Sequence, residues 1–117
     1  MTGRGAVHER SGKALANDLE MPQTFVGRGL GLMFRRTLEP GRGMWIAPCN
    51  SIHMMFMRFP IDAVFLDSKE RVKKVFRTLP AWRGVVWVVW GAHSVLELPP
   101  GSTDGIDLQS GDQILIT

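Results

Sequence analysis

The sequence has a single cysteine and lacks any long apolar run. With Cys49 alone, no disulfide can form within the chain, which fits a reducing compartment. The longest apolar run, residues 85–90, is far below the roughly 20 residues that span a bilayer. The N-terminal residues also lack the apolar segment that a signal peptide needs. We therefore expect a cytoplasmic protein without a membrane partner.

Basic residues are missing from the last part of the chain. All 14 lysines and arginines lie at or before Arg83 together with 7 of the 11 acids, which gives +7, and the four later acids give −4. Such an asymmetry favours anionic partners, including nucleic acid, or head-to-tail self-association. No nucleic-acid-binding motif accompanies the charge. A solvated basic face is therefore the favoured interpretation.

The chain has room for one hydrophobic core. Its 117 residues, 44% of them hydrophobic, suffice for one domain and not for two ordinary ones. Residues 1–14 are polar and without periodicity, which predicts a flexible N-terminal arm. The domain is expected to span residues 15–117, and no internal repeat divides it.

Short apolar segments between turn residues predict a β-rich fold. Strands are predicted at residues 15–21, 43–47, 51–59, 61–66, 72–78, 85–90, 93–98 and 113–117. Apolar residues three or four apart predict a helix at residues 30–37. Ser102 or Thr103 can cap a short helical turn that ends at Leu108. The fold class is mostly β (α+β): a compact, partly open small β-barrel or a mixed sheet, with one or two short helices.

Two charged residues stand inside the apolar stretch at residues 43–67. Burial of such groups is costly unless they are paired, so Arg58 and Asp62 are the first candidates for a site. A structural ion pair between them is the favoured interpretation. The alternative is a pocket for a polar or anionic ligand. Its candidate ligand-binding residues are Arg58, Asp62, Trp82, Arg83 and Glu97.

Cys49 and His53 are candidates for metal or thiol chemistry. On an extended strand they share a face about 13 Å apart, too far to bind one ion, whereas a helix or bulge between them would bring them close. Asp62 or His93 could then join them. A buried thiol and a hydrogen-bonded histidine remain favoured. Hence no metal site and no cofactor are predicted.

The four tryptophans allow two interpretations. Trp45, Trp82, Trp87 and Trp90, with Arg77 and Arg83 nearby in the sequence, could form a surface for sugar rings or single-stranded nucleic acid. Aromatic residues in strands are more often core, and a chain of this size needs core. The core interpretation is therefore favoured.

Several motifs resemble, in order, those of one widespread prokaryotic family of small domains of unknown function. The family pattern contains a Gly-Leu-Met turn, a Met-Arg/Lys-x-x-Pro-x-Asp core, a Leu-Glu-x-x-x-Gly segment and a terminal Gly-Asp. The resemblance covers residues 31–117 and implies a single β-rich domain, without an activity to transfer. Many members carry a signal peptide or lipid anchor, which is not expected here. The matching segments are GLMFR (31–35), GMWI (43–46), SIHMMFMRFPIDAVFLD (51–67), LPAWR (79–83), VLELPPG (95–101) and Gly111-Asp112.

From the sequence, a binding module is favoured over an enzyme. The expected ligand is small and polar or anionic, a class that includes sugars. The alternative is a small hydrolase or metal-assisted enzyme that uses His53 with Cys49 or Asp62. Nucleic-acid binding through the basic surface is third. The sequence leaves open whether any reaction is catalysed.

Overall fold

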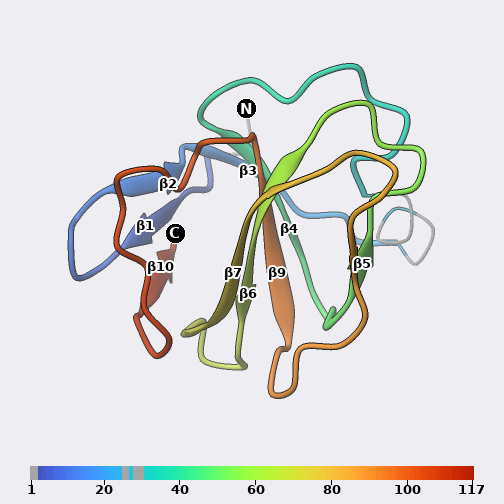
Figure 1. Ribbon diagram of the computed structural model, residues 1–117. Coiled ribbons are helices and arrows are strands. Elements are labelled where there is room, and N and C mark those ends of the chain that lie inside the picture. Colours follow the sequence, from blue (N-terminus) through green and yellow to red (C-terminus); the bar gives the residue numbers. More distant parts are fainter. Residues whose placement is uncertain (1–2, 25–26, 28–30) are drawn as a thin grey trace.

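The structure, a computed structural model, describes residues 3–24, 27 and 31–117. Within these ranges ten strands form three sheets (Figure 1). The strands are β1 (Ala6–His8), β2 (Ala14–Ala16), β3 (Asp18–Glu20), β4 (Arg42–Ile46), β5 (Ile52–His53), β6 (Ile61–Leu66), β7 (Val72–Leu79), β8 (Val85–Val86), β9 (Ser94–Leu98) and β10 (Ile114–Ile116). The mostly β fold expected from the sequence is confirmed. No helix in the described ranges is long and apolar enough to cross a membrane.

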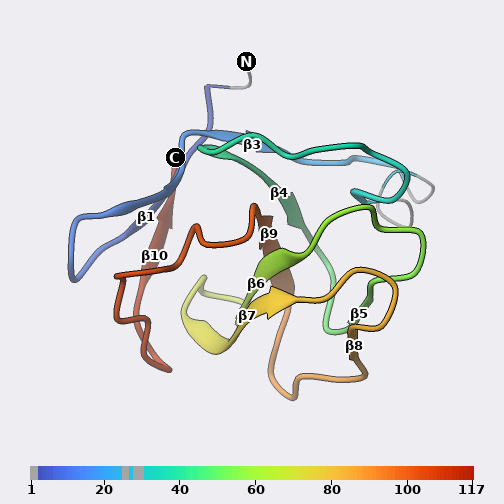
Figure 2. The ribbon, with the colours of Figure 1, turned by 45° about the horizontal axis from the view of Figure 1, so that its top comes forward.

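A five-stranded mixed sheet forms the centre of the molecule. Its order is β3-β4-β9-β6-β7, with β3 parallel to β4 and the other pairs antiparallel. The sheet β10-β1-β2 lies beside it on one side, and the two-stranded sheet β5-β8 lies on the other (Figures 1 and 2). Because both faces are covered, β6 and β9 are buried at every position. The sheets do not close on themselves, so the mixed-sheet expectation is right and the barrel is wrong.

The central sheet separates two hydrophobic cores. Side chains alternate between the faces of a strand, so Val64 and Leu96 pack toward β1, β2 and β10, whereas Phe65 and Val95 pack toward β5 and β8. The same alternation sorts the buried acids. Asp62 pairs with Leu98 on the first face, and Glu97 pairs with Ala63 on the second. The two acids therefore face opposite cores.

The N-terminal segment is part of this architecture. β1 pairs with β10 and with β2, and Ala6 and His8 are fully buried. His8 donates a hydrogen bond from Nε2 to Asp112 Oδ2 at 2.7 Å, and its Nδ1 lies 2.7 Å from Ser11 Oγ. The polar composition of residues 1–14 predicted a flexible arm, whereas residues 6–8 form β1 and Ala14 begins β2, with strand partners distant in the sequence.

Two apolar segments leave the strand conformation where longer strands were expected. In residues 51–59 only β5 is a strand, and Met54 and Met57 are both buried three residues apart. A strand would place them on opposite faces, whereas a turn directs both to the core. Residues 85–90 behave alike, because only β8 is a strand and Val86 and Val89 are the buried pair.

The predicted helices differ from the structure as well. Residues 31–34 form turns, and Gly31 and Phe34 have φ angles of 51° and 68°, which a right-handed helix does not contain. Leu30 lies outside the described residues. Residues 101–105 also form turns, since Thr103 binds Asp62 and does not cap a helix.

Gly43 on β4 gives a direct test of the packing at the central sheet. A Cβ there would lie 2.8 Å from Leu98 Cδ2 and 3.1 Å from the Glu97 carbonyl oxygen. We expect Gly43→Ala to lower the free energy of unfolding by about 1–3 kcal/mol, because the core has no room for the added carbon. Denaturant unfolding measures the effect. Leu98→Val in the same background should recover part of the loss, and a Gly43→Ala protein as stable as wild type contradicts this packing.

Candidate functional site

Asp62 is the second residue of β6 and is fully buried. Its Oδ1 accepts a hydrogen bond from the Thr78 amide at 2.9 Å. Its Oδ2 accepts two more, from the Thr103 amide at 3.0 Å and the Thr103 hydroxyl at 2.6 Å. Three donors satisfy a buried carboxylate without any opposite charge. The carboxylate thus ties β6, β7 and the 101–105 turn together.

The bond to Thr78 has a local cause. The β6–β7 register shifts between Ile61 and Ala63, and Thr78 opposite has a φ of 53°. Such a bulge removes an amide from the regular ladder. Asp62 accepts a hydrogen bond from this freed Thr78 amide. Arg77, next along the bulge, donates to the Thr103 hydroxyl at 3.1 Å and to the Ile106 carbonyl at 2.9 Å.

The expected ion pair between Arg58 and Asp62 is absent from the described part of the chain. Arg58 is exposed, whereas Asp62 is enclosed by its three donors. Trp82 and Arg83 are exposed on the loop that follows β7. Glu97 faces the opposite core from Asp62. Consequently the five ligand-site candidates do not converge on one pocket.

A different pocket lies between the central sheet and the segment that carries β5. It has a volume of about 230 Å³. Three residues singled out from the sequence meet in its wall: Cys49, His53 and Glu97. The rest of the lining is mainly apolar and consists of Gly31, Leu32, Met33, Ile46, Ser51, Ile52 and Met57.

Glu97 is the chemically unusual group of this pocket. Its side chain is buried, and no described residue donates a hydrogen bond to the carboxyl. Burial raises the pKa of Glu97 to about 7, against the opposing effect of the Arg35 charge. Arg35 itself is held by Glu20 in a two-bond ion pair. At neutral pH the Glu97 carboxyl is therefore present in both its protonated and ionised forms.

Gly31 is packed directly against this carboxyl. A Cβ at Gly31 would lie 3.3 Å from Glu97 Oε1 and 3.6 Å from Ile46 Cδ1. The φ of 51° at Gly31 adds a second reason for glycine. The Gly-Leu-Met turn and the Leu-Glu segment, 66 residues apart in the sequence, thus meet at the pocket.

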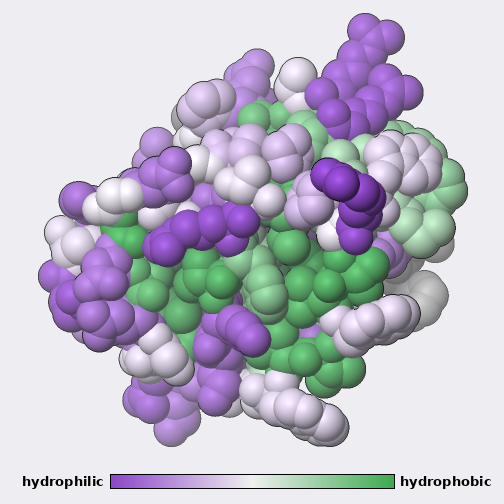
Figure 3. Space-filling view, viewed as in Figure 1, coloured by the Kyte–Doolittle hydropathy of each residue, from purple (hydrophilic) through white to green (hydrophobic). Residues whose placement is uncertain are grey.

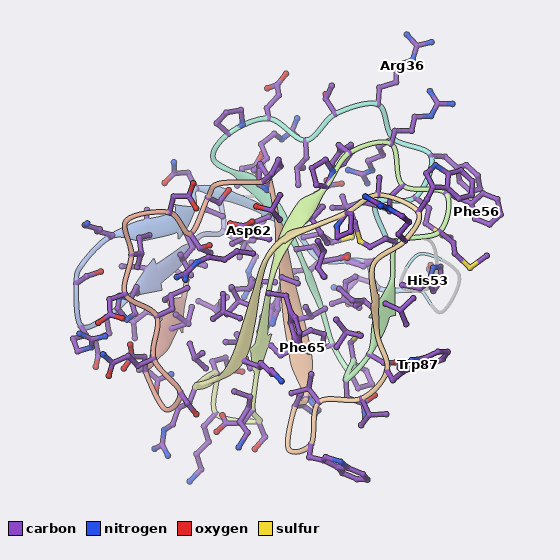
Figure 4. All side chains as sticks on the ribbon, viewed as in Figure 1. Arg36, His53, Phe56, Asp62, Phe65 and Trp87 are labelled. Atoms are coloured by element: carbon purple, nitrogen blue, oxygen red, sulfur yellow. The ribbon has the colours of Figure 1, made fainter. Side chains whose placement is uncertain are left out.

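Cys49 and His53 share the pocket wall but have different environments. The Cys49 thiol donates to the Ser51 carbonyl at 3.1 Å, and burial raises the pKa of this thiol. A raised pKa keeps the sulfur protonated and weakens it as a nucleophile. His53 is exposed on β5, on the far side of the sheet from Asp62 (Figure 4). The predicted combination of His53 with Asp62 is therefore not formed.

Metal binding finds no support in the geometry. Among the described residues, no three His, Cys, Asp or Glu side chains are grouped closely enough to hold an ion. His93 approaches Cys49 through its backbone, since the Cys49 amide donates to the His93 carbonyl at 2.8 Å. Two side-chain ligands fall short of a zinc site.

Three of the four tryptophans are exposed, contrary to the core interpretation. Trp82, Trp87 and Trp90 have exposed fractions of 56%, 82% and 86%. Only Trp45 packs against a core cluster. The sequence favoured core because residues 85–90 look like a buried strand, whereas the strand ends at Val86 and the irregular segment that follows leaves Trp87 and Trp90 exposed. Phe34 and Phe56, also exposed, were not singled out, because both were assigned to apolar faces of regular elements.

The fold and the pocket define a small β-rich domain with a buried carboxyl at the wall of a mainly apolar pocket. The chain belongs to the family DUF192, "Uncharacterized ACR", whose pattern it matches over residues 6–116. This confirms the family resemblance found in the motifs.

Relatives and solved structures agree with that assignment. A UPF0127 protein from Thermococcus sibiricus is 33% identical over 113 residues, which cover 92% of this chain and 71% of the relative. One from Pyrococcus horikoshii is 33% identical over 115 residues, with coverage of 92% and 95%. A crystal structure of a protein of unknown function from Novosphingobium aromaticivorans is similar, with a TM-score of 0.80 at 21% identity and coverage of 96% and 82%. A protein from Sinorhizobium meliloti, provisionally named a transcription regulator, has a TM-score of 0.79 at 20% identity and coverage of 97% and 91%. At these identities the two structures show the fold alone.

Proposed function

We propose that the protein is a binding module for a small, uncharged polar ligand, held at Glu97 in the pocket beside β5. The observation that carries this proposal is a buried carboxyl that faces the pocket without a hydrogen-bond donor among the described residues. A ligand that donates to or accepts from this carboxyl gains a hydrogen bond in a largely desolvated site.

The lining narrows the class of ligand. The volume of about 230 Å³ lies below the range of roughly 300–1,000 Å³ that suits drug-sized molecules. A hydroxyl or amide group can donate to and accept from a carboxyl, so polyols, sugars and small amides are the matching chemistry. Arg58, the basis for an anionic ligand, does not line the pocket. Glu97, once ionised, repels anions.

The test compares three proteins in a ligand-observed NMR screen of small polyols, monosaccharides and primary amides. Wild type and Glu97→Gln are expected to bind the same members, since both offer hydrogen-bond partners at this position. The affinity of Glu97→Met for the same compounds should be lower by about tenfold or more, which corresponds to one lost hydrogen bond to the ligand. Glu39→Gln, at an exposed glutamate outside the pocket, is the control.

Binding should also depend on pH. A ligand that accepts a hydrogen bond from the protonated carboxyl binds below the Glu97 pKa of about 7 and is lost above it. Equal binding by wild type and Glu97→Met, or no binding from any of the three compound classes, contradicts the proposal.

An enzyme is the second candidate, and the Glu97 pKa of about 7 favours it. A carboxyl with a pKa near the working pH is suited to general acid–base catalysis, and His53 lines the same pocket. Cys49 is a weaker choice as nucleophile because its pKa is raised. Turnover of small esters or amides that disappears in both Glu97→Gln and His53→Ala would support this candidate, and turnover that persists in either variant would remove it.

A further inference from the structure

Three exposed aromatic side chains, none of which lines the Glu97 pocket, form a cluster. The ring centroids of Phe34 and Phe56 are 5.3 Å apart, and those of Phe56 and Trp82 are 5.0 Å apart. Their exposed fractions are 56%, 41% and 56%. Met55 beside them is 48% exposed. Large apolar side chains gathered on the surface in this way mark an interaction site.

The backbone under this cluster is strained. Phe34, Phe56 and Trp82 have φ angles of 68°, 65° and 67°. This left-handed conformation costs roughly 1–2 kcal/mol for a residue with a side chain, and glycine or asparagine normally occupies it. Bulky aromatic residues at three such positions are poorly explained by folding, whereas strain of this kind is found at functional sites.

Backbone hydrogen bonds join the three turns that carry the rings. The Phe34 amide donates to the Phe56 carbonyl at 3.1 Å. The Trp82 amide donates to the Met54 carbonyl at 2.7 Å, and the Met54 amide donates to the Gly84 carbonyl at 2.8 Å. The rings are therefore presented together at the tips of connected turns, without a need to assemble on binding.

Arginines accompany each ring. Arg36, Arg58 and Arg83 are exposed and stand one or two residues from an aromatic residue of the cluster. The three segments that carry the rings, residues 31–37, 54–60 and 80–84, contain no aspartate or glutamate. We call this surface the aromatic–arginine patch; it consists of Phe34, Met55, Phe56, Trp82, Arg36, Arg58 and Arg83.

Two members of the patch, Phe56 and Arg36, can be located in the figures. Figure 4 places Phe56 at the right edge of the molecule and Arg36 above it. Figure 3, in the same view, shows hydrophobic residues at that edge beside strongly hydrophilic ones. Trp87 projects from a lower part of the molecule, well separated from Phe56 (Figure 4).

We propose that the aromatic–arginine patch docks the protein on an anionic phospholipid surface. Aromatic and methionine side chains at loop tips enter the boundary between headgroups and acyl chains. Each arginine near an anionic membrane adds electrostatic attraction. The absence of acids from the three turns matches that negative surface. This activity is separate from ligand binding at Glu97 and goes beyond the proposed function.

The arrangement of the rings favours lipid over the other occupants. A nucleic-acid platform leaves ring faces free for successive bases, whereas Phe56 lies between Phe34 and Trp82 with interplanar angles of 33° and 62°. A two-fold dimer through the patch would bring its arginines together. The expectation of no membrane partner came from the lack of a spanning segment, which a peripheral contact does not require.

Co-sedimentation with vesicles tests the proposal on the full chain. Wild type should bind vesicles of phosphatidylcholine and phosphatidylserine in equal parts, should bind pure phosphatidylcholine far less, and should be released by salt. Phe56→Asn with Trp82→Asn should weaken binding by about tenfold or more, since two buried aromatic side chains are lost. Each of Arg36→Gln and Arg58→Gln should weaken it by about fivefold.

The exposed tryptophans outside the patch provide the matched control. Trp87→Asn with Trp90→Asn removes two larger exposed rings and should leave vesicle binding unchanged. In a Trp87→Phe, Trp90→Phe protein, brominated lipid should quench the fluorescence of Trp82. Equal losses of vesicle binding in the control pair and the patch pair would overturn the proposal. Tight binding of an oligothymidylate without binding to the mixed vesicles would also overturn it. So would a dimer, detected by light scattering, in which the patch is buried.

Stability measurements separate this role from a role in folding. Asparagine accepts the left-handed conformation, so Phe56→Asn should keep or raise the free energy of unfolding while vesicle binding falls. If the rings served the fold, the variant would be less stable and its loss of binding would follow from unfolding. A marked loss of stability in Phe56→Asn therefore counts against the proposal.

Discussion

Replacement of Asp62 by alanine is expected to lower the free energy of unfolding by about 3–5 kcal/mol, because each buried donor left without an acceptor costs about 1–3 kcal/mol. The change removes the acceptor of the Thr78 amide and of both the amide and the hydroxyl of Thr103. The total free energy of unfolding of a small domain is only about 5–15 kcal/mol. Denaturant unfolding with a constant m-value measures the loss.

The double-mutant cycle with Arg58 distinguishes this network from an ion pair. Arg58 is exposed and does not approach Asp62 in the structure. Arg58→Met alone should change stability by less than about 0.5 kcal/mol, as for ordinary surface positions. The coupling energy of the two substitutions should be zero within error. A clear coupling would mean that the two residues do interact, which contradicts the structure.

Thr103→Val is a finer control within the same network. Valine keeps the volume of threonine and the backbone amide, so one of the three hydrogen bonds to Asp62 is lost, together with the hydrogen bond from Arg77 to the same hydroxyl. We expect a smaller cost, about 1–2 kcal/mol. A loss in Asp62→Ala no larger than the loss in Thr103→Val would show that the backbone donors find other acceptors.

Glu97→Gln is expected to stabilise the protein at pH 8 and not at pH 5. The pKa of Glu97 is about 7 in the folded protein and 4.5 as an ordinary glutamate. The folded state therefore binds the proton more tightly, and this stability is fully present below pH 4.5 and is lost as the pH rises through 7. The loss by pH 8 is about 3 kcal/mol. Glutamine stays neutral, so its advantage should approach that value at pH 8.

Unfolding curves of wild type and Glu97→Gln between pH 4 and pH 9 provide the measurement. The wild-type curve should fall relative to the variant mainly between pH 4.5 and 7. The stability of Glu20→Gln relative to wild type should change with pH in the opposite direction, because the ion pair with Arg35 lowers the pKa of Glu20. Parallel wild-type and Glu97→Gln curves would show that the carboxyl is solvated and would remove the basis of the proposed pocket chemistry.

The bounds of the central strands were predicted correctly or within one residue from the sequence, because these segments are mainly apolar. The segment at residues 61–66 forms β6 with the expected bounds, and that at 93–98 differs from β9 by one residue. Such segments are buried on both faces in a covered sheet. Where apolar residues lie three apart, as at Met54 and Met57, a turn buries them equally well, and the sequence does not distinguish the two.

The structure brings together only some of the candidate residues. Asp62 is buried, as expected, but its partners are hydrogen-bond donors from residues 16 and 41 positions away and not the expected Arg58. Glu97, named among the candidate ligand-binding residues, lines a pocket together with Cys49 and His53 instead of Arg58 and Asp62. Their grouping required the register of β9 against β4 and β6, which alternation alone does not supply.

The sequence by itself determined that the chain forms a small β-rich domain of the DUF192 family, because composition, strand patterns and ordered motifs are local properties. It also determined that a few charged groups would be buried. The tertiary structure decided which face of the sheet each of them occupies. Asp62 and Glu97 stand on β6 and β9 at neighbouring levels, but the two-residue period of a strand sends them to opposite cores. One acid thereby stabilises the fold, and the other faces a pocket.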